Sequence, residues 1–252
     1  MHLLIFGATG LCGRAVVQSA IQSIEVQTVT VFVRDESRAR EMFSKYANAQ
    51  QQPSTEIIYT AGDIYNASHV NNAMQNVDAI ISCVASYTRP HTQISTLTQN
   101  VVDANASDSM EGNDDRKVLY IHFGFPRGLG PMGTFAENCI LKLTKFVSRT
   151  KYRPAMKEHV RAKQTLEEYC GQSKGRELLD FSIFAAPAMV DKPGGKREYL
   201  GKGGSLGEAV KKSRVWHYIS THDAADLMLS HLSIAMNDSS RELPKLLCLS
   251  YI

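Results

Sequence analysis

Three glycines at a spacing of three residues, Gly7, Gly10 and Gly13, constrain the fold of this 252-residue chain most. They follow a short apolar run, Leu3–Phe6, and precede an amphipathic stretch, Leu11–Ile24. In such a turn one glycine permits the sharp bend, one lets backbone N–H groups approach a ligand, and one lets the helix pack closely on the sheet. The pattern therefore predicts a doubly wound α/β domain whose first turn holds a pyrophosphate.

The alternation of strands and helices continues along the chain. Apolar or β-branched runs predict further strands at Thr28–Val33, Glu56–Thr60, Asp78–Val84, Lys117–Phe123, Leu179–Ala185 and Lys245–Ser250. Amphipathic stretches predict helices at Ser37–Tyr46, Ser68–Asn76, Thr92–Ala106, Phe135–Ser148, Ala155–Cys170 and Thr221–Ala235. Continuous apolar strands between such helices are typical of a parallel sheet covered on both faces. We expect one domain, residues 1–252, with a Rossmann fold and a small C-terminal substrate lobe formed by residues near 126–155 and 187–218.

Composition excludes several classes of function. Hydrophobic residues make up 43% and charged residues 21%, which is ordinary for a soluble globular protein. The net charge of +3, with no stripe of Lys and Arg, argues against nucleic acid as a partner. No apolar run approaches the roughly 20 residues that span a bilayer. Five scattered cysteines without a CxxC pair, and a strand that leaves no room for a leader, favour reduced thiols and a cytoplasmic location.

The glycine turn offers donors for phosphate. Thr9 adds a hydroxyl, and Leu11 stands at the helix start, where free N–H groups and the helix dipole attract anions. The alternative is a glycine-rich turn without a ligand. It is disfavoured because three glycines lose much conformational entropy on folding, a loss that close approach of a ligand would explain.

The end of the second strand bears on the choice between NAD(H) and NADP(H). An acid at this place accepts from the ribose 2′-hydroxyl of NAD, whereas a 2′-phosphate prefers a guanidinium. Arg34 comes first here, and Arg38 lies near the start of the next helix. These two residues favour NADP(H), with Asp35 as a helix cap. The alternative for Arg34 is a solvated surface cation.

Two further strand ends belong to the expected cofactor site. Asp63 and Ile64 follow the third strand; the Asp63 carboxylate either accepts from the adenine amino group or stabilises a turn, and both interpretations stay open. Val84, Ala85 and Ser86 follow the fourth strand, where small residues suit the close passage of a dinucleotide.

The motifs together resemble the atypical short-chain dehydrogenase/reductases, and within them the group that contains biliverdin-IXβ/flavin reductase and the NmrA-like NADP-binding proteins. The segments that carry this resemblance are Ile5–Gly10, Val33–Asp35, Gly62–Ile64, Asp78–Ile81, His159–Lys163, Leu179–Ile183 and Ile219–Leu229. The resemblance covers the chain from end to end. It implies NADP(H) binding and hydride transfer to flavins, tetrapyrroles, quinones or other carbonyl-like acceptors, although some members only sense the nucleotide.

A helical pair is the candidate catalytic apparatus. Classical members of the family use Tyr and Lys four residues apart, where the Lys lowers the pKa of the Tyr and holds the nicotinamide ribose. His159 and Lys163 have this spacing and share one helix face. We expect Lys163 to contact the ribose and His159 to donate a proton. The alternative is a packed His159 and a solvated Lys163.

The chain departs from the family where the acceptor would bind. Phe123 stands near the expected serine of the fifth strand, and Met189, after Pro187, stands where the biliverdin/flavin reductase has a histidine. Phe123, Phe125 and Met189 would instead line an apolar pocket at the nicotinamide, under a glycine-rich flap at Lys192–Gly207. Such a pocket suits a flat small-molecule hydride acceptor.

Two hypotheses follow. The first is an NADP(H)-dependent oxidoreductase that reduces a flavin, quinone or other carbonyl-like molecule. The second is a non-catalytic NADP(H)-binding sensor or assembly factor, because the catalytic Ser and Tyr are missing. A sugar-nucleotide epimerase is disfavoured by the missing Tyr and the short second lobe. The adjacent His222 and Asp223 are expected to be structural, no residue set has metal-ligand spacing, and no hydrolase motif is present.

Overall fold

The computed structural model describes residues 1–47, 55–85, 93–110, 117–124, 153–185, 189–190, 219–238 and 246–248. Its strands are β1 (His2–Phe6), β2 (Thr28–Val33), β3 (Glu56–Ala61), β4 (Ala79–Ser82), β5 (Val118–Gly124), β6 (Leu179–Ala185), β7 (Met189–Val190), β8 (Ile219–Ser220) and β9 (Leu246–Cys248). Its helices are α1 (Leu11–Gln22), α2 (Glu36–Ala47), α3 (Ala67–Met74), α4 (Gln93–Met110), α6 (Arg153–Cys170), α7 (Ser173–Leu178) and α9 (Thr221–Asn237).

Seven strands form one parallel sheet in the order β3-β2-β1-β4-β5-β6-β9. The chain runs outward from β1 to β3 and then returns to the other side of β1 with β4. The carboxyl ends of β1 and β4 therefore flank the topological switch point, where open α/β sheets bind their ligands. A short parallel pair, β7 and β8, forms a separate sheet. The predicted Rossmann-type α/β fold is confirmed.

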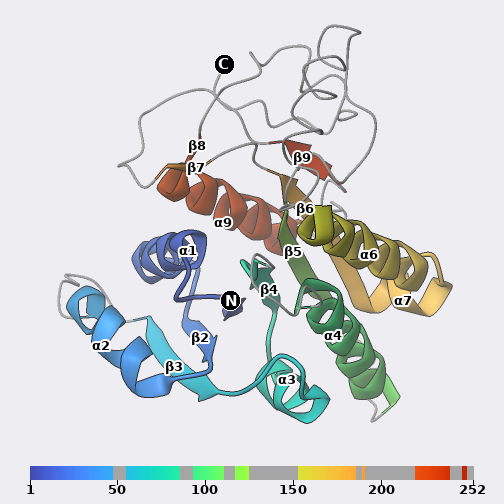
Figure 1. Cartoon of the computed structure of the whole chain (residues 1–252), viewed down its shortest axis with the longest axis horizontal. Coiled ribbons are helices and arrows are strands. Elements are labelled where there is room, and N and C mark those ends of the chain that lie inside the picture. Colours follow the sequence, from blue (N-terminus) through green and yellow to red (C-terminus); the bar gives the residue numbers. More distant parts are fainter. Residues whose placement is uncertain are drawn as a thin grey trace, which may run out of the picture.

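Helices cover both faces of the sheet (Figure 1), and an apolar core lies between helices and sheet on each face. Along β1, Leu3 and Ile5 face the core shared with α1, α2 and α9, while Leu4 and Phe6 face the core shared with α3, α4 and α6. All four side chains are fully buried. This explains why β1 is apolar from Leu3 to Phe6, since successive residues point to opposite and equally buried faces.

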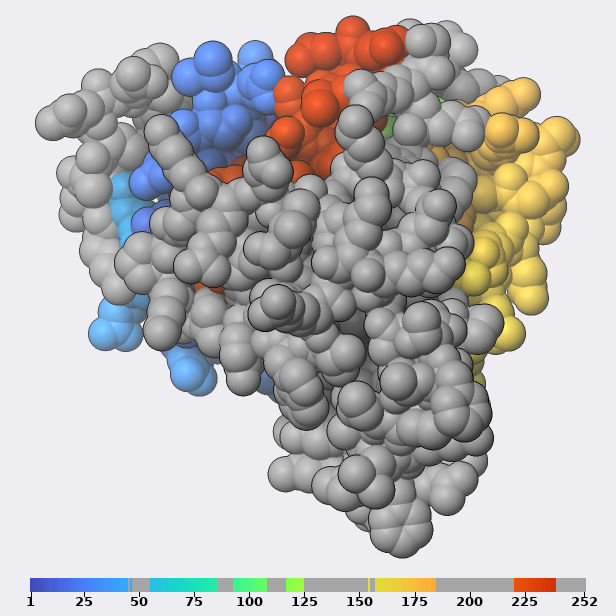
Figure 2. All heavy atoms as spheres, turned by 90° about the horizontal axis from the view of Figure 1, so that it is seen from above, coloured from blue at the N-terminus to red at the C-terminus, as the bar shows by residue number. Residues whose placement is uncertain are grey.

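The elements at the two ends of the chain meet in space. Helix α9 packs against α1, although more than 190 residues separate them. Seen from above, α9 in red lies beside N-terminal residues in blue, with α6 and α7 in yellow at the opposite flank (Figure 2). Helix α1 is thus packed against an element from the far end of the chain.

Several element bounds differ from the prediction. β4 ends at Ser82 rather than Val84, because the chain beyond it turns to contact Gly7. Helix α7 was not predicted, because six residues that include Gly175 show no helical apolar period. The predicted helix at Phe135–Ser148, the flap at Lys192–Gly207 and most of the expected substrate lobe lie outside the described residues. The single-domain assignment stays a prediction.

Candidate functional site

The turn between β1 and α1 lies in close contact with the residues that follow β4. Gly7 has a φ of +73°, which L side chains rarely adopt, and a Cβ there would lie 2.8 Å from the carbonyl carbon of Cys83. A Cβ on Gly13 would lie 2.2 Å from the carbonyl oxygen of Gly7. The packing of α1 and β4 on the turn therefore requires glycine at both positions.

Gly10 differs from the other two glycines. Its φ of −73° and ψ of 171° are open to any residue, and a Cβ there would approach only the Gly7 carbonyl oxygen, at 3.2 Å. The residue is exposed. This contact is tight, but a shift of a few tenths of an ångström relieves it, so the fold requires glycine less strongly here than at Gly7 and Gly13.

The start of α1 is equipped for an anion. Gly10 is the N-cap and has no side chain to accept from the first N–H groups, which have no partner inside the helix. The first turn contains no acidic residue, and Thr9 and Leu11 are exposed beside it. The combination leaves N–H donors and the positive end of the helix dipole open to a ligand.

Arg14, in the first turns of α1, was not singled out from the sequence. Its Nε is buried and has no hydrogen-bond partner in the described part of the chain. A guanidinium with a free donor so close to the turn adds positive charge for a phosphate. The only sequence signal was its place directly after the third glycine.

Two thiols lie next to the turn. Cys83 Sγ lies 3.6 Å from Cys12 Sγ, and both residues are free cysteines. The hydrogen bond to Cys12, together with burial, raises the pKa of the Cys83 thiol well above its ordinary value. The Cys83 thiol is therefore protonated at neutral pH.

The charged residues in and after the β2–α2 connection have different roles. The Asp35 carboxylate accepts from the backbone N–H of Arg38 at 3.0 Å, so Asp35 caps α2 as predicted. Arg34 and Arg38 are exposed, and neither forms an ion pair with another described residue. Arg40, by contrast, pairs with Glu36 at 2.7 Å and lies over the ring of Tyr59. Two guanidinium groups at this strand end are thus available to a ligand.

The β3–α3 connection uses Asp63 as a turn residue. Its carboxylate accepts from the N–H of Tyr65 at 3.0 Å, and its own N–H donates to His69 Nδ1 at 3.2 Å. Ile64 packs against the second core, and its carbonyl accepts from Asn100 at 2.7 Å. The turn role of Asp63 is therefore present in the structure, while the adenine contact stays a prediction.

Of the other residues predicted to bind the cofactor, the structure describes some and not others. Val84 is half-buried beyond β4, Ala85 is exposed, and Phe123 is half-buried against the first core. Ser86, Phe125 and Pro187 lie outside the described residues, and of Met189 only the backbone, in β7, is described.

A histidine pair that the sequence did not reveal lies at the carboxyl end of β5. His122 Nε2 lies 2.8 Å from His159 Nδ1, and the ring centroids are 5.0 Å apart. His122 is fully buried, whereas His159 retains 7% exposure. Burial lowers the pKa of His159 to about 4, against the opposing effect of the Glu158 carboxylate. Burial, and then His159, lowers the pKa of His122 well below its ordinary value.

Lys163 lies one turn further along α6. Its Nζ forms an ion pair with Glu167 Oε1 at 2.9 Å, and the two side chains are 29% and 50% exposed. Such an exposed pair along a helix contributes only about 0.3–0.5 kcal/mol, so a ligand phosphate or hydroxyl can replace it at little cost. His159 and Lys163 share a helix face, but within the described residues one contacts β5 and the other contacts its own helix.

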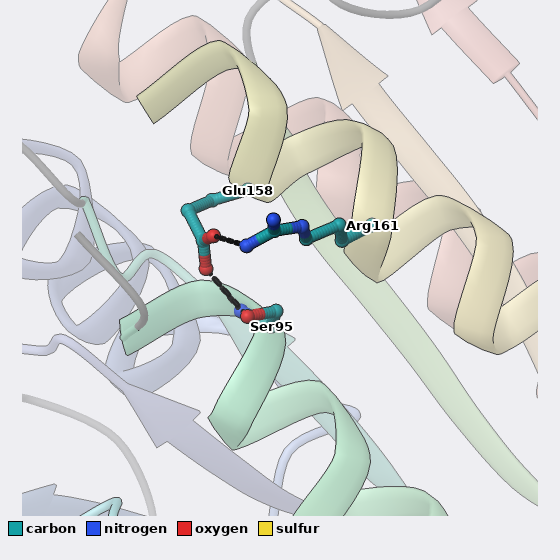
Figure 3. Close-up of polar contacts among 3 residues, drawn as sticks. All are labelled: Ser95, Glu158 and Arg161. Atoms are coloured by element: carbon teal, nitrogen blue, oxygen red, sulfur yellow. Dashed lines mark hydrogen bonds and ion pairs between the residues drawn. The ribbon is translucent and has the colours of Figure 1, made fainter. Parts of the chain in front are cut away.

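A polar cluster of Ser95, Glu158 and Arg161 links α4 to α6 (Figure 3). The Glu158 carboxylate is 2% exposed and accepts from the hydroxyl and the N–H of Ser95 in α4. Its other oxygen pairs with Arg161 at 2.9 Å. Because Glu158 directly precedes His159, these contacts with α4 fix the position of this part of α6 relative to β5.

The described residues contain no group of three His, Cys, Asp or Glu that could hold a metal ion. No helix in this part of the chain is long and apolar enough to cross a membrane.

Comparison with known families agrees with the geometry of the turn. Residues 7–114, which begin at the first glycine, match the model of an NAD(P)H-binding family. The matched region runs from the glycine turn through α4. No curated protein matches the chain.

Solved structures share the fold at low identity. A Rossmann-fold NAD(P)-binding protein from Shigella flexneri is 15% identical, with a TM-score of 0.57, over 99% of this chain and 93% of the other. A short-chain dehydrogenase/reductase from Veillonella parvula, in complex with NADP, is 11% identical, with a TM-score of 0.62, over 99% and 94%. An alcohol dehydrogenase from Thermococcus sibiricus, with 5-hydroxy-NADP, is 11% identical, with a TM-score of 0.62, over 100% and 96%.

Proposed function

We propose that this protein is an NADP(H)-dependent oxidoreductase of the atypical short-chain dehydrogenase/reductase class, which reduces a flavin, a quinone or another carbonyl-like small molecule. The main support for this proposal is Gly10, an exposed glycine with an ordinary backbone conformation. It stands at the start of α1, which has no side-chain cap and no acidic residue in its first turn. A pyrophosphate lying over this turn accounts for the missing side chain, because any Cβ at Gly10 would point into its space.

The preference for NADP(H) rests on the charges at the end of β2. A carboxylate at this place would repel a 2′-phosphate, but the Asp35 carboxylate is engaged as the cap of α2. Arg34 and Arg38 are exposed. A guanidinium can form a bidentate pair of hydrogen bonds with a phosphate, so both residues suit a 2′-phosphate. Two of the structural neighbours carry NADP or a derivative of it.

The catalytic role is proposed for the carboxyl end of β5 and the facing part of α6. Lys163 would leave Glu167 to contact the nicotinamide ribose, and His159 would contact the acceptor. NADPH supplies the hydride; the protein binds and orients the two reactants and excludes water from between them.

The nucleotide preference has a direct test. Calorimetric titration should show tighter binding of NADPH than of NADH, and Arg34→Glu should reverse that order because the new carboxylate repels the 2′-phosphate and accepts from a ribose hydroxyl. Arg40→Glu serves as the matched control, since Arg40 is engaged by Glu36 and Tyr59. Equal titration curves for the two nucleotides in the wild-type protein would rule out the Arg34 role.

A second candidate, a non-catalytic NADP(H)-binding sensor or assembly factor, is favoured by one observation. The helix position that family members give to a tyrosine is held by His159, which is nine-tenths buried and neutral at neutral pH. Under this alternative the protein binds NADPH but does not oxidise it in the presence of flavins, quinones or aldehydes. Stoichiometric NADPH oxidation with any one of them excludes it.

A further inference from the structure

The histidine pair lies within reach of a nucleotide bound at the glycine turn. Phe6, Ser82 and His122 are register partners on the adjacent strands β1, β4 and β5. Neighbouring strands are about 4.8 Å apart, so the end of β1 and His122 are separated by about 10 Å across the sheet. All three strands end at the carboxyl edge, where a dinucleotide would run from the turn toward β5.

Counting protons fixes the arrangement of the pair. Both rings are neutral at neutral pH because burial disfavours their charged forms, so each ring carries one proton and a single proton lies between them. If His159 Nδ1 donated it, the proton of His122 would sit on Nδ1. That atom is fully buried and has no partner among the described residues.

The opposite arrangement avoids this penalty. When His122 Nε2 donates to His159 Nδ1, the buried His122 Nδ1 is a bare acceptor, and unpaired buried acceptors are less rare in proteins than unpaired N–H donors. His159 must then carry its only proton on Nε2, the ring atom on the side away from the hydrogen bond.

We propose that His122 is a positioning residue that holds His159 as its neutral Nε2–H tautomer, and that His159 Nε2–H is a hydrogen-bond donor to the reacting end of the bound nucleotide or its acceptor. This role rests on the proposed function. A neutral imidazole donates a hydrogen bond to a carbonyl oxygen and polarises it, as in other enzymes that keep a histidine uncharged. The proton that completes the reduction then comes from water rather than from an imidazolium.

The fold supports this role at both rings. His122 is fixed by the sheet register, and His159 is fixed by the Glu158 cluster, one residue earlier on α6. Gly124 closes β5 beside the pair, and even a Cβ there would lie 3.5 Å from both His122 Cδ2 and His159 Nδ1. Because β5 ends in glycine, no side chain at position 124 covers the two histidine rings.

The test is nitrogen NMR of the imidazole rings in protein labelled with ¹⁵N-histidine. At pH 7 two-bond ¹H–¹⁵N spectra should show both rings neutral and both protonated at Nε2. Addition of NADP⁺ should shift the His159 signals with the same midpoint that calorimetry gives for binding. A His159 ring protonated at Nδ1, or one that does not respond while calorimetry shows binding, overturns the proposal. Absence of any calorimetric heat instead defeats the proposed function, and the tautomers are still read from the free protein.

Two variants separate positioning from simple stability. His122→Gln keeps a donor near the position of Nε2, and His122→Phe keeps the ring but not the donor. We expect unchanged NADPH affinity in both variants. The kcat of His122→Gln should stay near the wild-type value, and the kcat of His122→Phe should fall about tenfold, the equivalent of one hydrogen bond.

His222→Phe is the control, since His222 is half-buried and bonded to Gln18 on α1. If His122→Phe does not fold, the wild-type spectra and His122→Gln decide; equal kcat losses in both His122 variants count against positioning.

Discussion

At the scale of single residues, the glycines of the first turn have different reasons to be there. Gly7 and Gly13 are required by contacts with Cys83 and with the turn itself, at 2.8 Å and 2.2 Å from a hypothetical Cβ. At Gly10 the requirement is weaker, since a Cβ would lie 3.2 Å from the Gly7 carbonyl oxygen, a tight contact that a small shift relieves. A ligand over the turn is our explanation for the absence of a side chain at this exposed place.

Replacement of Gly10 by valine should therefore separate binding from folding. We expect Gly10→Val to lose about 1 kcal/mol of stability, as for an apolar N-cap, but to weaken NADPH binding at least tenfold because its methyl groups occupy the phosphate space. Thermal melts and calorimetry measure the two effects. Gly171→Val is the matched control, because a Cβ there is as tight, 3.0 Å from the Glu167 carbonyl oxygen, yet lies at the end of α6. Wild-type affinity in Gly10→Val would contradict the assignment of the turn.

At the scale of elements, α1 is the piece whose position matters most. It presents its start to the switch point, and its buried face packs on β1, β2 and α9. At Gly13 the helix also lies directly against the backbone of the turn, at Gly7 and Ala8.

The substitution Gly13→Ala should thus act on the fold rather than on the ligand directly. A methyl group 2.2 Å from the Gly7 carbonyl oxygen cannot be accommodated without moving α1, and overpacking of this kind costs about 3 kcal/mol or more. Urea denaturation should show this loss, while Gly10→Ala should lose less than about 1 kcal/mol. Equal losses in the two variants would mean that α1 does not pack on the turn as described.

Much of the fold, and part of the site, could be predicted from local patterns. The β1–turn–α1 unit is short in sequence, so glycine spacing and apolar runs contain the information needed to place it. The early end of β4 and the extra helix α7 depend on tertiary contacts instead. The pairing of His122 with His159 joins residues 37 positions apart. Nothing in the sequence shows that the ring of His122 points toward α6 until strand register and helix height are known.

At the scale of the whole molecule, the buried histidines make stability depend on pH. In the unfolded chain a histidine has a pKa near 6.5, whereas His159 in the folded protein has a pKa of about 4. Between these two pKa values the unfolded state binds a proton at His159 that the folded state does not bind. The stability is therefore retained above pH 6.5 and is lost as the pH falls toward 4.

Between pH 7 and pH 5 the contribution of His159 to the free energy of unfolding should fall by about 2 kcal/mol. Urea denaturation at both pH values measures it. His159→Phe should show a smaller loss of stability over this interval, because it has no imidazole to titrate, while His222→Phe should behave like the wild type. An identical loss in wild type and His159→Phe would show that the buried pair does not govern acid sensitivity.

The proposed function requires the first turn of this chain to hold the pyrophosphate of NADP(H). A crystal structure of the protein grown with NADP⁺ would show whether it does. We predict pyrophosphate oxygens within hydrogen-bond distance of the backbone N–H groups at Leu11 and Cys12, and the 2′-phosphate against Arg34. A dinucleotide bound elsewhere, or an empty turn at saturating NADP⁺, would contradict the claim.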